Sequence, residues 1–243
     1  MLSSVKNTGV GSDTVVDENE NRAMPRLIFG TGTGRCGTWS LFRLLQAQKG
    51  VAAMHEGFYL PFDPNILRFW RLLYRAMTGC RNTRCIATVS FVWINYMSEI
   101  MSHILNPKVI CLKRPREETV ESWMIHQPEL NLLTDLKSKH WDDKYEYLEK
   151  QGDQWPKFDL PKKEAHGAYW DYVYDAADYW EKKFPDNFRI FETNDLNSHE
   201  GVKSMLDFAE IPEKNQVVHV GVKLNTKENH RGLIDVQRNS ACS

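Results

Sequence analysis

The segment FGTGTGRCGTWS, residues 29–40, constrains the fold of this chain more than any other. It lies between the apolar run RLIF and the helical pattern LFRLLQAQ, so it predicts a strand, a tight turn and a helix in succession. Its four glycines permit a turn that exposes backbone N–H groups at the start of the helix, where the helix dipole also favours an anion. The segment therefore predicts a site for a phosphate-like group.

Apolar strand-like runs alternate with helical patterns along the rest of the chain. The predicted strands are residues 26–30, 50–55, 84–90, 108–113 and 188–192. The predicted helices are residues 36–48, 63–77, 90–105, 116–126 and 166–184. Such alternation is typical of parallel βαβ units. We therefore expect an α/β fold, a single domain in which helices flank a parallel sheet of about five strands, with the site at the carboxyl ends of the strands.

Two segments fall outside this alternation. Residues 1–24 are polar and acidic, and they predict a disordered tail ahead of a domain that spans residues 25–243. Residues 127–164 are charged and aromatic without a regular period. So long an irregular segment in a compact domain is often a lid or a binding loop. We expect a substrate lid there, and a solvated surface excursion is the alternative.

Composition limits the partners and the compartment. The chain has 243 residues, 42% of them hydrophobic, and a formal net charge of −1, which argues against general binding to nucleic acid or anionic membranes. No apolar run approaches the ~20 residues that cross a bilayer, and the first residues lack the apolar core of a signal peptide. The five cysteines show neither a disulfide framework nor metal-ligand spacing, so we expect a cytoplasmic protein without a bound metal.

The glycine-rich segment partly matches the phosphate loop of nucleoside-triphosphate enzymes, GxxxxGK[ST]. Gly32 and Gly37 have the required spacing, but Thr38 and Trp39 stand where the pattern needs a lysine and a hydroxyl residue. The cation for the terminal phosphates and the hydroxyl for magnesium are both missing. An ordinary ATP or GTP site is therefore not expected.

The same segment also matches the dinucleotide pattern GxGxxG through Gly32, Gly34 and Gly37. Glu56 follows the second predicted strand, where a dinucleotide-binding fold keeps the acid that binds the ribose. An NAD(P)-dependent oxidoreductase is therefore an alternative. This pattern does not account for Arg35, because a long cation in the middle of the turn suits a highly charged terminal group better than a pyrophosphate bridge.

A second phosphate element follows the fourth predicted strand, in KVICLKRPREETVESW. Arg114 leaves the strand and Ser122 lies eight residues later on the next helix, so a guanidinium fork and a hydroxyl can grip one phosphate together. This R-x7-S element, with the GxxRxGT loop after the first strand, resembles the sulfotransferases that use 3′-phosphoadenosine 5′-phosphosulfate (PAPS). The resemblance spans most of residues 26–232.

The resemblance implies that the glycine-rich loop binds the 5′-phosphosulfate of PAPS. Arg35 takes the role of the basic residue, and the glycines and hydroxyls around it lend hydrogen-bond donors. Cys36 stands where the family usually has a serine, and Trp39 is one place away from the tryptophan that stacks on adenine in the cytosolic branch. The loop residues of the implied cofactor site are Gly34, Arg35, Cys36, Gly37, Thr38, Trp39 and Ser40.

The resemblance also implies that Arg114 and Ser122 bind the 3′-phosphate. HRG, residues 230–232, is similar to the family's late basic-glycine segment and adds Arg231 and Gly232 to the cofactor site. FETNDL, residues 191–196, is similar to an interrupted form of the family's YEDL segment.

Catalysis requires a base, because the acceptor hydroxyl or amine loses a proton while the leaving phosphate oxygen gains charge. The cytosolic branch uses a histidine ahead of the 3′-phosphate element, where this chain reads ATVSFVW and has none. Other branches use a glutamate near the end of the second strand, where this chain reads MHEGFY. The resemblance therefore implies Glu56 as the general base. His55, whose side chain alternates to the opposite face, is the second candidate.

These roles describe an enzyme that moves a sulfuryl group from PAPS to a small-molecule hydroxyl or amine and releases 3′-phosphoadenosine 5′-phosphate (PAP). Arg35 would stabilise charge on the leaving group, and no metal ion is required. A nucleotide-binding module without catalysis is a further alternative, since the residues that bind phosphate serve binding alone equally well. The sequence indicates neither the acceptor nor the oligomeric state.

Overall fold

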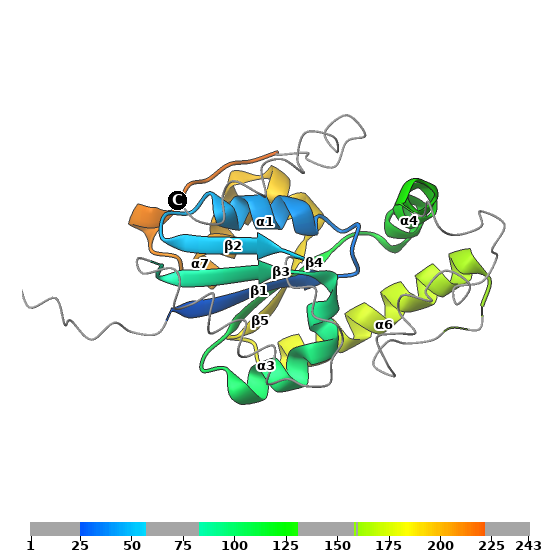
Figure 1. Ribbon diagram of the computed structural model, residues 1–243, viewed down its shortest axis with the longest axis horizontal. Helices are drawn as coiled ribbons and strands as arrows, with labels where there is room; N and C mark the ends of the chain where they lie inside the picture. Colours follow the sequence, from blue (N-terminus) through cyan, green and yellow to red (C-terminus); the bar gives the residue numbers. More distant parts are fainter. Residues whose placement is uncertain (1–24, 57–82, 131–157, 159, 222–243) are drawn as a thin grey trace, which may run out of the picture.

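A parallel sheet of five strands forms the centre of the computed structural model, which describes residues 25–56, 83–130, 158 and 160–221 (Figure 1). The strand order is β2-β3-β1-β4-β5. The strands are β1 (Arg26–Gly32), β2 (Val51–His55), β3 (Cys85–Val89), β4 (Lys108–Lys113) and β5 (Phe188–Glu192). The α/β class and the five predicted strands are confirmed.

Helices cover both faces of the sheet (Figure 1). One face carries α1 (Thr38–Gln46) and α7 (His199–Phe208). The other carries η1 (Phe91–Tyr96), α3 (Met97–His103) and α6 (Lys162–Lys183). α4 (Arg116–Leu130) lies beyond the carboxyl ends of the strands, and the short helices η3 (Thr193–Asn197) and η4 (Glu213–Asn215) follow β5 and α7.

Alternation along the strands divides the core into two clusters. On β1, Leu27 and Phe29 face η1, α3 and α6, whereas Ile28 between them faces α1 and α7. Both faces of the sheet are covered, so a strand such as β3 is buried at every position and reads as a continuous apolar run. This burial is why the strands could be recognised from their composition.

Several predicted segments lie outside the described residues. They include the tail at 1–24, the helix at 63–77 and most of the predicted lid. At the margins of the lid, α4 continues to Leu130 and α6 begins at Lys162, so both helices are longer than their periodicity indicated.

Candidate functional site

The glycine-rich loop joins the central strand β1 to the start of α1. Gly34 and Gly37 have left-handed φ angles of 73° and 97°, and Arg35 between them has φ 55°. A Cβ atom at Gly34 would lie 2.8 Å from Cζ2 of Trp123, so this position accepts only glycine. Gly37 is the N-cap of α1, and no side chain of the described residues caps the helix. Its first backbone N–H groups therefore suit an anion.

Hydrogen bonds connect the two predicted phosphate elements. Nε of Arg35 donates to the hydroxyl of Ser122 at 3.2 Å. Nη1 of Arg114 donates to the carbonyl oxygen of Arg35 at 3.1 Å. The loop after β1 and the start of α4 after β4 thus form one basic surface, because β4 pairs directly with β1 and both strands end at the same edge.

Thr193, which the sequence analysis did not single out, ties the loop to β4. Its hydroxyl lies 2.6 Å from the carbonyl oxygen of Cys36 and 3.1 Å from that of Lys113. Thr193 opens η3, whose start is held by a reciprocal cap between Glu192 and Asp195. The signal in the sequence was a threonine that directly follows the strand FRIFE, inside the segment similar to YEDL.

Trp123 is a second residue that sequence reasoning missed. It lies on α4 one residue after Ser122, contacts the position of Gly34, and stacks on the ring of His166 with centroids 5.5 Å apart. His166 is buried on α6. Trp123 and His166 therefore brace the glycine-rich loop against α4 and α6.

His55 faces the start of α1. Its Nε2 lies 3.4 Å from the hydroxyl of Thr38, and its ring packs on Trp39 and Phe42 at centroid distances of 4.8 and 5.8 Å. Burial among these rings lowers the pKa of His55 to about 4. The imidazole is therefore neutral near pH 7 and a weak base.

Glu56 differs from His55 in both exposure and titration. It is exposed, its φ of 46° is left-handed, and its N–H donates to the carbonyl oxygen of Val89 at 3.0 Å. Although part of the side chain meets solvent, the surrounding protein desolvates the carboxyl and raises its pKa above the ordinary value. A strained backbone at a strand end is frequent at functional sites.

The remaining predicted residues have different surroundings. Cys36 is fully buried, and burial raises the pKa of its thiol, so it acts as a small packing group of the turn. Trp39 and Ser40 are half-buried in the first turn of α1. Phe191, in the segment similar to YEDL, packs in the core against Phe208. Arg231 and Gly232 lie outside the described residues.

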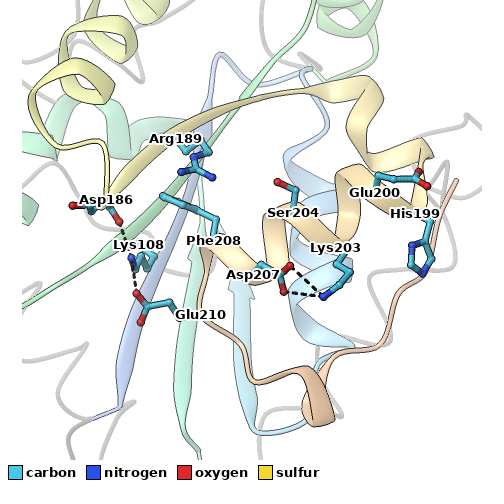
Figure 2. Close-up of a pocket in the computed structure, with 10 residues that line it drawn as sticks. All are labelled: Lys108, Asp186, Arg189, His199, Glu200, Lys203, Ser204, Asp207, Phe208 and Glu210. Carbon is cyan, nitrogen blue, oxygen red and sulfur yellow. Dashed lines mark hydrogen bonds and ion pairs between the residues drawn. The ribbon is translucent and has the colours of Figure 1, made fainter.

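A pocket of about 600 Å³ runs from the amino end of β4 along α7 (Figure 2). Ion pairs occupy its wall, with Lys108 bound to Glu210 at 2.8 Å and Lys203 to Asp207 at 3.2 Å. It contains none of the predicted site residues. Within the described ranges, no helix has the length and apolar character to traverse a membrane, and no group of three His, Cys, Asp or Glu side chains could hold a metal.

Comparison with known proteins gives structural similarity only. No protein-family model and no curated protein sequence matches the chain. A sulfotransferase from Alicyclobacillus acidocaldarius aligns over 88% of this chain and 91% of its own, with 14% identity and a TM-score of 0.56. A sulfotransferase domain from the curacin biosynthetic pathway aligns over 77% and 75%, with 14% identity and a TM-score of 0.53. The fold is similar to that of sulfotransferases.

Proposed function

We propose that this protein is a PAPS-dependent sulfotransferase that transfers a sulfuryl group to a hydroxyl or amine of a small-molecule acceptor. The observation that carries the proposal is the chain of hydrogen bonds from Ser122 to Arg35 and from the Arg35 carbonyl to Arg114. Two anion-binding elements in contact suit a nucleotide with phosphate groups at both its 5′ and 3′ positions.

The residues present fit such a nucleotide. Gly34 and Gly37 let the backbone approach a phosphate closely, and Arg35 and Arg114 supply two cations on one surface. PAPS supplies an activated sulfuryl group and a phosphate leaving group when it is bound. Arg35, at the centre of the loop, would stabilise charge that develops on that leaving group.

Glu56 is the general base in this proposal. Its raised pKa makes it a stronger base than an ordinary carboxylate, and its exposure leaves it accessible to an acceptor. His55 fits the role less well, because its pKa is about 4 and its Nε2 contacts Thr38. We assign His55 to positioning Thr38 at the start of α1.

The strand order weighs against the dinucleotide alternative. In a dinucleotide-binding fold the second strand pairs with the first, which brings its terminal acid to the glycine turn. Here β3 lies between β1 and β2, so Glu56 is two strands away from β1. The pattern GxGxxG is present without the strand pairing that normally accompanies it.

Calorimetric titration tests the proposal directly. The purified protein is titrated without magnesium with PAP, ADP and NAD⁺ in parallel. Tight binding of PAP and weak binding of the other two is the expected result. Preference for NAD⁺ would instead support the oxidoreductase alternative. If the protein binds PAP but releases none from PAPS with any phenol, alcohol or amine, it is a nucleotide-binding module.

A further inference from the structure

The guanidinium of Arg114, in the connection between β4 and α4, already binds a carboxylate of α4. Nε of Arg114 donates to Oε2 of Glu118 at 3.1 Å, while Nη1 donates to the carbonyl oxygen of Arg35 at 3.1 Å. Glu118 lies in the first turn of α4. One donor of the cation assigned to the 3′-phosphate is therefore taken by a carboxylate.

Glu118 also lies between the two residues that would grip the phosphate. Glu118 follows Arg114 by four residues and pairs with it. It also precedes Ser122 by four residues on α4, so Glu118 and Ser122 share a face of that helix. Helical side chains tilt toward the amino end, so the carboxylate of Glu118 points back toward Arg114. A phosphate in contact with both Arg114 and Ser122 must share this space with Glu118.

We infer that Glu118 is a built-in competitor of the 3′-phosphate, which holds Arg114 before the nucleotide binds and weakens the binding of PAP afterwards. The inference rests on the proposed function. The Glu118 side chain is 58% exposed, so it can turn toward solvent when a phosphate arrives. Competition of this kind speeds release of the product nucleotide, because the carboxylate takes back the donor that the phosphate leaves.

Glu118 has two opposing effects on PAP binding, and repulsion of the phosphate is the larger. A carboxylate about 6 Å from a phosphate dianion in water weakens its binding by roughly tenfold before salt screening. The opposing contribution, orientation of Arg114 by an exposed ion pair, is worth about twofold to fivefold. Removal of the Glu118 charge is therefore expected to strengthen binding.

The test compares three variants by calorimetry at low salt, with PAP and with adenosine 5′-phosphate, which lacks the 3′-phosphate. Glu118→Gln removes the charge and keeps a hydrogen-bond acceptor, and Glu118→Ala removes both. Glu117→Gln is the matched control, because it also removes an exposed charge from the first turn of α4. Thermal denaturation of each variant verifies that α4 is intact.

The expected result is that both Glu118 variants bind PAP about twofold to fivefold more tightly than the wild type, whereas Glu117→Gln and the adenosine 5′-phosphate affinities change less than twofold. If wild type binds PAP and Glu118→Ala binds it more weakly, Glu118 orients Arg114 and the inference is overturned. Equal effects of the Glu117 and Glu118 variants would overturn it as well. Absence of PAP binding in every variant would refute the proposed function itself, and this inference with it.

Discussion

Arg35 and Ser122 are 87 residues apart in the sequence, yet Nε of Arg35 donates a hydrogen bond to the Ser122 hydroxyl at 3.2 Å. The contact joins the loop after β1 to the helix after β4. Each residue belongs to a different predicted phosphate element, so the hydrogen bond holds the two elements of the candidate site together. A change at either element should consequently be measurable in nucleotide binding.

Arg114→Ala should abolish discrimination in favour of the 3′-phosphate. The variant loses a guanidinium that contacts the loop at the Arg35 carbonyl, and a hydrogen bond to a charged group is worth about 1.5–3 kcal/mol, or roughly tenfold to a hundredfold in affinity. Calorimetry should show this loss for PAP and little change for adenosine 5′-phosphate. Arg116→Ala is the control, since Arg116 pairs with Asp171 on α6 at 2.8 Å. An unchanged preference for PAP would place the 3′-phosphate site elsewhere.

Glu56→Gln should lower turnover of PAPS by roughly 10²–10⁴ and leave PAP affinity intact, because a general base acts on the acceptor. In the wild type the carboxyl must be deprotonated to act, and its pKa is raised by desolvation. Turnover should therefore climb with pH through an apparent pKa above about 4.3, the ordinary glutamate value. Glu213→Gln, at an exposed position of η4, is the control. Undiminished turnover in Glu56→Gln would remove Glu56 from catalysis.

Gly34→Ala should weaken both the fold and the site. A methyl group there is strained by the left-handed backbone and meets Trp123 at 2.8 Å, so we expect a loss of about 2–4 kcal/mol in the free energy of unfolding and at least a tenfold loss in PAP affinity. Gly50→Ala is the control, since its φ is 77° but its added Cβ has ordinary 3.7 Å contacts with Arg84. Urea denaturation measures the loss of stability, and calorimetry measures the loss of PAP affinity. Equal losses of affinity in both variants would show that backbone strain alone is responsible.

Thr193→Val should loosen the loop while it preserves side-chain volume. The variant leaves the carbonyl oxygens of Cys36 and Lys113 without their hydroxyl partner, which should lower the free energy of unfolding by about 1–3 kcal/mol and reduce PAP affinity. Thr193→Ser keeps the hydroxyl and should retain most of the free energy of unfolding and most of the PAP affinity. If the serine and valine variants bind PAP equally, the Thr193 hydroxyl does not hold the loop in its binding conformation.

His55 should make the fold sensitive to acid. Its pKa is about 4 in the folded protein and about 6.5 when unfolded, so between these values the unfolded chain binds more protons and stability falls as pH falls. From pH 7 to 4.5 the wild type should lose on the order of 2 kcal/mol more than His55→Phe, after allowance for partial exposure. The raised pKa of Glu56 acts with the opposite sign and is present in both proteins. If urea denaturation shows that the wild type and His55→Phe lose the same free energy of unfolding between pH 7 and 4.5, His55 does not cause the sensitivity to acid.

Local pattern was sufficient for the strands, the helix that follows the glycine turn and the tight turn itself. A strand covered on both faces needs a continuous apolar run, as in β3, and a left-handed turn needs glycine, as at Gly34 and Gly37. Both requirements act between neighbours in the sequence. The limits of α4 and α6 were harder to predict, because helix ends depend on what packs against them.

Contacts between distant segments depended on the order of the strands. The apolar runs of the strands are too alike to specify which strand pairs with which, so periodicity could not indicate that β4 lies beside β1 or that β3 separates β1 from β2. That order brings Arg35 to Ser122, Thr193 to the loop carbonyl of Cys36, and Trp123 to Gly34. The sequence alone therefore determined the types of group in the site, and tertiary packing determined which of them meet, because burial and pairing are properties of the assembled sheet.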